Sequence, residues 1–258
     1  MLDAFVASAR RSHGIVLATG PTGSGKTTTL YGALQLRDVR TEKVITVEDP
    51  VEYRLSGVTQ VPVNARAGMT FASGLRSLLR QDPDVIMVGE MRDTETARIA
   101  IQAAMTGHLV LSTVHTNDAP SAVMRLIDLG VEPYLVAATL QGVLAQRLVR
   151  RVCVHCAEEH TPDPAFRSLS PAFDPDARLR TGRGCALCMQ TGFRGRVGLF
   201  EWMPVDDAMR SRIVAAPDLV RIRALATEAG MKTMRDDGRA KVLDGITTAR
   251  EVLRAIQS

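Results

Sequence analysis

The stretch that decides the fold reads Ile15-Val-Leu-Ala-Thr-Gly-Pro-Thr-Gly-Ser-Gly-Lys-Thr-Thr-Thr-Leu30. An apolar run ends at Gly20, and the pattern G-x-x-x-x-G-K-T extends from Gly20 to Thr27. The glycines allow a tight turn that points backbone N–H groups inward, and the start of the following helix adds partial positive charge. A buried strand, a glycine-rich turn and a helix start together predict a phosphate-binding P-loop.

This P-loop predicts roles for its side chains and backbone. Lys26 is expected to reach the β- and γ-phosphates of a nucleotide, and the Thr27 hydroxyl is expected to ligate Mg²⁺. The remaining predicted nucleotide contacts are Gly20, Thr22, Gly23, Ser24, Gly25 and Thr28. The alternative is a glycine-rich turn that fits the pattern by chance, which the preceding strand and the following helix disfavour.

The composition is that of an ordinary soluble globular protein. The 258 residues are 45% hydrophobic and 23% charged, and their length suits one large domain or a core with appendages. Aromatic residues make up only 4% of the chain, which disfavours a nucleic-acid surface built on base stacking. There is no run of 18 apolar residues and no signal-peptide pattern, so a cytoplasmic protein is predicted.

Strands and helices are predicted to alternate along the first 150 residues. The predicted strands are 15–19, 44–47, 85–88 and 109–114, and the predicted helices include 1–13, 26–37, 71–80, 94–105, 120–129 and 134–149. Asp93 is the predicted N-cap of the helix 94–105. This alternation indicates βαβ units, and the almost continuous apolar character of the strands indicates burial on both faces. An α/β fold with a mostly parallel sheet flanked by helices is therefore expected.

The composition changes after Arg150. Residues 151–200 are predicted to be rich in loops, with a tight basic turn at 192–198, whereas 205–257 is predicted to be helical with breaks at Pro217, Gly230 and Gly245. The sequence thus predicts three parts. They are a core at 1–150, a subdomain at 151–200 that contains the cysteines of the chain, and a C-terminal helical region at 201–258.

All four cysteines of the chain fall in two C-x-x-C pairs. The pairs are Cys153-Val-His-Cys156 and Cys185-Ala-Leu-Cys188. Four thiolates can form a closed tetrahedral zinc site, in which no position is open for catalysis. Redox pairs or disulfides are the alternatives. Structural zinc is favoured because the pairs enclose a loop-rich stretch that is predicted to have no apolar core of its own.

Acidic residues follow two of the predicted strands. Glu90 ends a hydrophobic strand, as in a Walker B segment, although Gly89 stands where an aspartate is usual, and Glu48 and Glu52 follow the neighbouring strand. A carboxylate at such a strand end can hold a Mg²⁺-bound water or orient the attacking water. We therefore expect Glu90, Glu48 and Glu52 to be catalytic, with turn capping as the alternative.

Two histidines flank the predicted strand 109–114. His108 precedes this strand, and His115 follows it. A histidine at a strand end can contact the γ-phosphate of a nucleotide as a neutral N–H donor or as an imidazolium. A structural polar role is the alternative for each of them.

Taken together, these motifs resemble those of the secretion-superfamily ATPases, which include the type II secretion ATPase and the type IV pilus motors. The matching segments are a Walker A motif at 20–27, an Asp box at 46–53, a Walker B region at 75–93 and a His box at 106–117. The cysteine pairs and the Gly-Arg-Val-Gly turn also match. The resemblance covers essentially the whole chain.

This resemblance implies a RecA-like P-loop core that hydrolyses ATP within a homo-hexamer and works with inner-membrane secretion platform proteins. The implied cofactors are ATP, Mg²⁺ and Zn²⁺. Glu90 and the acids of the Asp box would set up water and metal, and His115, together with His108, would contact the γ-phosphate region. Arg76 and Arg80 match arginines that the family uses near the nucleotide and the subunit boundary, so they are candidates for stabilising transition-state charge.

The tetracysteine segment resembles that of the secretion and pilus-assembly branches of the family. Retraction motors typically lack this segment, so the resemblance disfavours a retraction motor. The preferred hypothesis is the motor domain of a type II secretion ATPase that powers pseudopilus assembly and protein export, located at the inner membrane through its partners. The alternative is a type IV pilus assembly ATPase. Full-length members have further domains before the core, so this chain is expected to bind nucleotide, hydrolyse it weakly and form hexamers poorly.

Two rivals come from other functional classes. One is a zinc-stapled nucleotide-binding interaction module with little hydrolysis. The other is a nucleic-acid motor, which the sequence pI of about 9.1 would suit. The scarcity of aromatic residues and the resemblance to secretion motors argue against nucleic acid as a partner.

Overall fold

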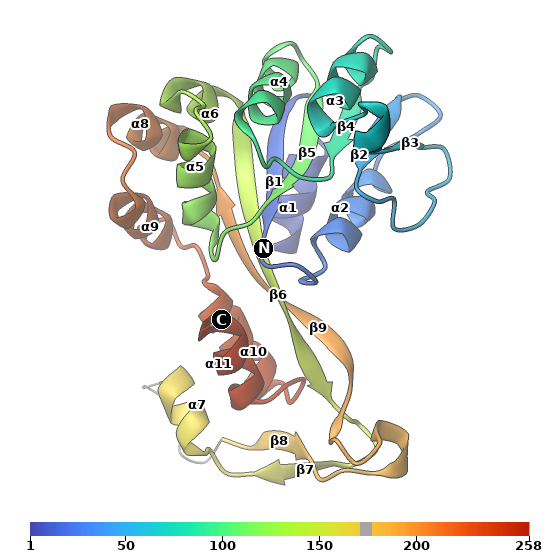
Figure 1. The fold of residues 1–258 in the computed structure, drawn as a ribbon. Coiled ribbons are helices and arrows are strands. Elements are labelled where there is room, and N and C mark those ends of the chain that lie inside the picture. The colour runs from blue at the N-terminus through green and yellow to red at the C-terminus, as the bar shows by residue number, and fades with distance from the viewer. Residues whose placement is uncertain (171–176, 258) are drawn as a thin grey trace. The chain divides into compact units, whose positions relative to one another are not determined.

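A computed structural model describes residues 1–170 and 177–257 (Figure 1). These residues form two compact units. The first comprises residues 1–145 and 202–231, and the second comprises the described parts of 146–201 and 232–258. Each unit is assembled from two stretches of sequence, and the three-part division at residues 150 and 200 stays a prediction.

The first unit is organised around the sheet. Its strands include β1 (Gly14–Thr19), β2 (Val44–Glu48), β3 (Thr59–Pro62), β4 (Val85–Val88) and β5 (Leu109–Val114), and the sheet also takes in β6 (Leu140–Val152) and β9 (Phe193–Pro204). Their order is β3-β2-β4-β5-β1-β6-β9. The pairs β1–β5, β1–β6, β2–β3, β2–β4 and β4–β5 are all parallel, which confirms the predicted fold class.

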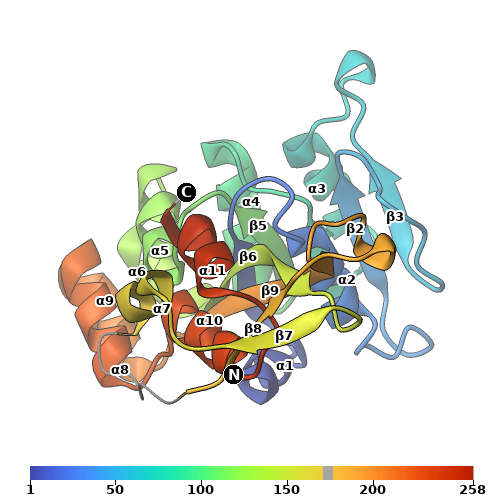
Figure 2. The same cartoon turned by 90° about the horizontal axis from the view of Figure 1, so that it is seen from below.

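Helices cover both faces of this sheet. On one face lie α1 (Leu2–Ala9) and α2 (Lys26–Leu34), and on the other lie α3 (Phe71–Leu79) and α4 (Thr94–Met105) (Figures 1 and 2). Every residue of β1, β4 and β5 is therefore buried, as their apolar sequences require. The predicted N-cap of α4 is confirmed, because the Asp93 carboxylate accepts a hydrogen bond from the Thr96 N–H at 2.8 Å.

The remaining helices of the first unit follow the sequence pattern. They are α5 (Ala119–Asp128), α6 (Pro133–Thr139), α8 (Asp207–Ala215) and α9 (Leu219–Glu228). Helix α8 packs against α6, and α9 packs against α5. Among the described residues, no helix combines the length and the apolar character that a membrane crossing needs.

The predicted helix 134–149 is wrong in its second half. Helix α6 ends at Thr139, and β6 begins at Leu140 and pairs in parallel with β1. Gly142 lies so close to Trp202 that a Cβ there would come within 2.4 Å of the indole ring. The backbone of β1 needs a hydrogen-bonding neighbour on the side away from β5, and this tertiary demand overrides a local helical pattern.

The second unit contains a small antiparallel pair, β7 (Ala157–His160) and β8 (Leu179–Gly182), and three helices, α7 (Pro164–Leu169), α10 (Met234–Leu243) and α11 (Ala249–Gln257). Helix α11 packs against α7 and α10 (Figure 2). The breaks predicted at Gly230 and Gly245 do separate helices, and the predicted helical character of the C-terminal region is confirmed.

Two predictions about the loop-rich stretch are wrong. Phe166, Leu169 and Leu179 belong to a buried apolar cluster that also contains Val149, Leu199, Val242, Ala249 and Val252. The stretch therefore does have an apolar core, which local sequence could not reveal because much of it comes from the C-terminal helices. The basic segment predicted to turn at 192–198 instead enters strand β9, and residues 171–176 lie outside the described part.

A buried carboxylate that pairs with two partly exposed arginines stabilises this second unit. The Glu251 side chain of α11 is 5% exposed and accepts a hydrogen bond from the Arg150 guanidinium of β6 at 2.7 Å. Arg254 pairs with the same carboxylate at 2.8 Å. Burial by itself raises the pKa of Glu251, but the bonds from Arg150 outweigh it and hold this pKa below its usual range.

Replacing Glu251 with Gln should lower the free energy of unfolding at neutral pH by about 2 kcal/mol, the loss of one hydrogen bond to a charged group. Because the folded-state pKa is depressed, the stabilisation is complete above the usual carboxyl range and disappears as pH falls through the folded pKa. In urea unfolding, the difference in unfolding free energy between wild type and Glu251→Gln should therefore be smaller near pH 3 than at pH 7. The control is Glu159→Gln on the exposed edge of β7, and an equal loss at both pH values would contradict the assignment.

Candidate active site and cysteine cluster

The P-loop connects β1 to α2. Gly20, Gly23 and Gly25 have φ angles of 145°, 76° and 88°, in the region that side chains resist, so the predicted need for glycine is met at all three positions. The N-cap of α2 is Gly25, which has no side chain to cap the helix. This leaves the helix start to receive an anion.

Lys26 is 8% exposed and lies along the P-loop. Its Nζ donates to the carbonyl oxygens of Gly20 at 2.8 Å and Pro21 at 2.9 Å, so the ammonium group sits over the turn that would hold phosphate. Thr27 is half-buried, Ser24 is buried, and Thr22 and Thr28 are exposed. The loop thus combines a fixed cation with hydroxyl groups at its rim.

The carboxyl ends of β4 and β5 bring two predicted residues together. Glu90 follows β4, His115 follows β5, and His115 Nε2 lies 3.3 Å from a Glu90 carboxylate oxygen. Glu90 is only 8% exposed, and it also pairs with Arg92. The hydrogen bond that Arg92 donates to Glu90 is the main reason why the pKa of Arg92 is raised, and the charge of Asp49 adds to it.

A threonine pair joins β1 to the histidine-containing loop. The Thr19 hydroxyl lies 2.7 Å from the Thr116 hydroxyl and accepts the Thr116 N–H at 2.9 Å. It also lies 3.2 Å from the Val114 carbonyl oxygen. Because Thr19 immediately precedes the P-loop and Thr116 immediately follows His115, these bonds fix the two loops relative to each other.

The two candidates of the Asp box lie in different surroundings. Glu48 is 2% exposed, at the end of β2, and accepts hydrogen bonds from Tyr31, Thr46 and Gln60. Glu52 is exposed on the loop that follows. The predicted site edge is thus formed by one enclosed carboxylate and one that faces solvent.

His108 lies at the opposite edge of the sheet. Gly14 at the start of β1 pairs with Leu109, so His108 stands beside the amino end of the strand whose carboxyl end carries the P-loop. Six strand residues separate these edges, or roughly 17 Å at the usual rise. His108 Nδ1 lies 2.8 Å from the Ala103 carbonyl oxygen at the end of α4, and this placement does not support a nucleotide contact within the chain.

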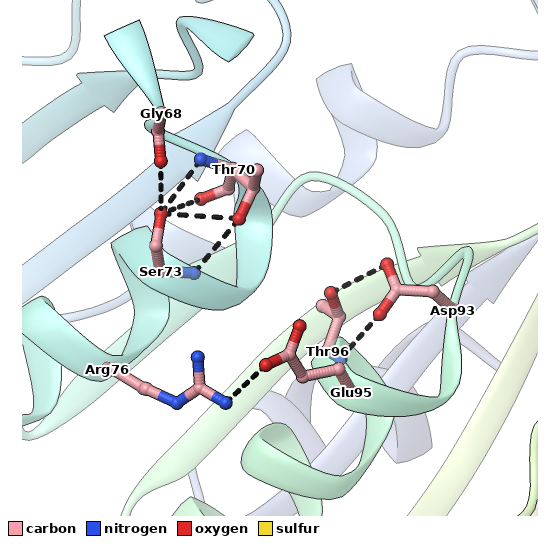
Figure 3. A network of polar contacts seen from close by, with 7 residues as sticks. All are labelled: Gly68, Thr70, Ser73, Arg76, Asp93, Glu95 and Thr96. Carbon is pink, nitrogen blue, oxygen red and sulfur yellow. Dashed lines mark hydrogen bonds and ion pairs between the residues drawn. The ribbon is translucent and has the colours of Figure 1, made fainter.

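The two predicted arginines lie on and after α3. Arg76 is exposed and pairs with Glu95 in the first turn of α4, next to the Thr70–Ser73 capping box and the Asp93–Thr96 cap (Figure 3). Arg80 is the exposed C-cap of α3. Within this chain Arg76 is engaged at an α3–α4 contact.

The four cysteines converge in the second unit. All four sulfur atoms lie within 4.8 Å of one another, and the separations are 3.9 Å for Cys153–Cys185, 3.8 Å for Cys156–Cys188 and 3.7 Å for Cys185–Cys188. A tetrahedron with Zn–S bonds of about 2.3 Å has sulfur–sulfur edges of about 3.8 Å. The cysteines are free thiols at metal-site spacing, so the arrangement fits a structural Cys₄ zinc ion.

Hydrogen bonding distinguishes the sulfur atoms. Burial raises the pKa of the Cys156 thiol to about 12. Burial acts in the same direction on Cys188, but N–H donors from Cys185 and Gly192 at 3.2 and 3.3 Å outweigh it and lower the pKa of Cys188 to about 6. Such N–H groups stabilise a thiolate, which is the form that binds metal.

Comparison with known proteins decides the family. A profile described as "Type II/IV secretion system protein" matches residues 1–254. The chain belongs to the Type II/IV secretion system protein family. This confirms the resemblance that the P-loop, Asp-box, Walker B and His-box segments indicated.

Named relatives lie on both branches of this secretion family. They include the type II secretion system protein HxcR of Pseudomonas aeruginosa, 54% identical over 245 residues, and the type IV pilus assembly ATPase PilB of Thermus thermophilus, 52% identical over 246 residues. The matches cover 95% and 94% of this chain, but 49% of HxcR and 28% of PilB. The chain thus spans about half the length, or less, of these relatives.

A solved structure supports the fold. The crystal structure of the pilus retraction motor PilT with bound ADP superposes with a TM-score of 0.74 at 29% identity. The superposition covers 98% of this chain and 64% of the PilT chain.

Three residues of this chain that lie beside the P-loop or the Glu90–His115 pair were not predicted from the sequence. Arg92 could have been noticed as a cation two residues after Glu90. Thr19 and Thr116 carry no such signal, because they are 97 positions apart and only the β1–β5 pairing brings them together.

Native mass spectrometry should find one zinc ion per chain of this secretion-family protein, and Cys185→Ser should lose it and melt at lower temperature, because three thiolates leave the tetrahedron open. Val154→Ala is the matched control, since this residue of the first knuckle is 76% exposed and is not a ligand. Freshly reduced wild-type protein without zinc would contradict the Cys₄ assignment.

Proposed function

We propose that this chain is an ATP-hydrolysing motor domain. The observation that carries the proposal is the common edge of the sheet, where the P-loop follows β1 and the Glu90–His115 pair follows the adjacent strands β4 and β5. A phosphate cradle beside a carboxylate–imidazole pair suits phosphoryl transfer to water, because that chemistry depends mainly on positioning and charge neutralisation.

In the proposed reaction each residue has a physical role. Lys26 would leave its loop carbonyls to meet the β- and γ-phosphates, and Thr27 would supply a hydroxyl ligand to Mg²⁺. Glu90 would orient the attacking water or a Mg²⁺-bound water, with His115 beside it contacting the γ-phosphate. Glu52 and Arg80 are exposed, so a neighbouring subunit could contact them.

The cysteine cluster would hold zinc in a structural role. Four thiolates fill a tetrahedral coordination sphere, so the ion would have no position for substrate. The metal would instead connect two sequence-distant knuckles, Cys153–Cys156 and Cys185–Cys188.

At the level of the whole protein, we propose a homo-hexameric type II secretion ATPase. Its ATP cycle would power pseudopilus assembly and protein export from the cytoplasmic side of the inner membrane, through platform proteins. The alternative is pilus assembly, which the 52% identity to PilB supports almost as well as the 54% identity to HxcR supports secretion.

Replacing the corresponding region of each full-length motor with this chain should separate these branches. A secretion motor should restore export in a type II host and leave a type IV host without pili. The Lys26→Ala form of each hybrid serves as the control. Restored piliation without restored export would favour the pilus-assembly alternative.

The hydrolytic proposal predicts two different losses. Lys26→Ala should abolish binding of MgATP, whereas Glu90→Gln should keep binding and reduce phosphate release by about 100-fold or more, because only the water-orienting carboxylate is removed. Fluorescent-nucleotide titration and phosphate release measure the two effects. Nucleotide binding by wild type with phosphate release no higher than that of Lys26→Ala would favour the interaction-module rival.

A further inference from the structure

A buried carboxylate cluster connects α2, β2 and β3 in the first unit. Glu48 accepts the Tyr31 hydroxyl on one carboxylate oxygen, and it accepts the Thr46 hydroxyl and the Gln60 amide, the latter at 3.2 Å, on the other. Tyr31 and Thr46 are completely buried, and Gln60 is 7% exposed. Both oxygens of Glu48 are therefore occupied by fixed neutral donors.

No cation pairs with Glu48 in the part of the chain that the structure describes. Hydrogen-bond donors alone therefore compensate for burying this carboxylate, which otherwise costs several kcal/mol. Burial, followed by the bond to Glu48, raises the pKa of Tyr31 well above its usual range, so the tyrosine keeps its proton and remains the donor.

Gln60 extends the cluster into the loop after β2. Its Oε1 accepts the Leu55 N–H at 2.7 Å, and its Nε2 donates to the Tyr53 carbonyl oxygen at 3.1 Å. The Tyr53 ring also packs edge-on against Tyr31, with centroids 4.7 Å apart. The Asp-box loop is thus held at both its start and its end by the residues that surround Glu48.

This environment does not suit a general base. A base must accept a proton from a water molecule that it touches. Glu48 is 2% exposed, and the three donors Tyr31, Thr46 and Gln60 use most of its roughly four acceptor positions. Glu90, in contrast, pairs with two partly exposed side chains, Arg92 and His115, which can move away.

We infer that Glu48 is a positioning residue, which with Tyr31 and Gln60 locks the P-loop helix α2 to the Asp-box loop. Tyr31 lies in the second turn of α2, whose first residue is Lys26, so the Tyr31–Glu48 bond fixes how α2 is set against β2. The backbone N–H groups of the P-loop are oriented by that helix. The inference rests on the proposed nucleotide function and assigns Glu48 a role different from catalysis.

The lock also places the next acidic residue. Asp49 immediately follows Glu48, and its charge is close enough to Arg92 to help raise the pKa of that guanidinium. Arg92 in turn pairs with Glu90. A shift of Glu48 would therefore be transmitted both to the phosphate cradle and to the Glu90 side of the site.

The test uses Tyr31→Phe, Glu48→Gln and the double variant. Tyr31→Phe removes the hydrogen bond to the Glu48 carboxylate, and Glu48→Gln replaces it with a weaker neutral one, while both changes keep side-chain shape. Each should therefore weaken binding of a fluorescent Mg²⁺-nucleotide about three- to tenfold. The double variant should lose little more than either single one, because the two residues act as one unit. Phosphate release at saturating MgATP should stay within about threefold of wild type.

Tyr53→Phe is the matched control, since it removes the hydroxyl of the neighbouring ring, which is half-exposed and makes no hydrogen bond among the described residues. A catalytic Glu48 would give the opposite pattern, with intact affinity and phosphate release lowered about 100-fold or more in Glu48→Gln. A lower urea midpoint with unchanged affinity would reduce the cluster to a structural role. Either result overturns the inference.

Wild type and Lys26→Ala are measured alongside, so that failure of the proposed function can be told apart from failure of the inference about Glu48. If wild type binds nucleotide no better than Lys26→Ala, the proposed function fails, and the inference that rests on it fails as well. If wild type binds and the Tyr31 and Glu48 variants match it, only the inference fails.

Discussion

The parallel pairing of β1 with β5 is the constraint on which the rest of the first unit depends. It aligns Thr19 with Val114 and so brings the residues after both strands, the P-loop and His115-Thr116, to one edge of the sheet. The Thr19–Thr116 bonds then hold these loops together. With β4 on the other side of β5, Glu90 joins the same edge directly after its strand.

Two buried glutamates show how position on this edge decides chemistry. Glu90 and Glu48 are both under 10% exposed, yet their partners differ in kind. Glu90 has charged or ionisable partners that are partly exposed, whereas Glu48 has neutral donors inside the protein. Partners of the first kind can be exchanged for water and metal, and partners of the second kind fix geometry. Burial alone would have placed the two residues in the same class.

The sequence predicts those parts of the molecule that local physics determines. The P-loop glycines, the Asp93 cap and the strand ends follow from dihedral freedom, capping and apolar runs, and they were found where expected. Strand β6 and the apolar cluster around Phe166 were missed because each depends on a partner distant in the chain. The same reason explains His108, whose closeness to a strand in sequence does not reveal which end of the sheet it occupies. The role of Glu48 required knowledge of Tyr31 and Gln60, which no spacing rule connects to it.

The glycine N-cap of α2 has a thermodynamic consequence. A capping side chain stabilises a helix by roughly a few tenths of a kcal/mol relative to glycine, and Gly25 cannot provide one. A bound phosphate would instead accept hydrogen bonds from the N–H groups at the start of α2, so nucleotide binding would stabilise the folded state. The melting temperature of this unit would then rise with the concentration of nucleotide.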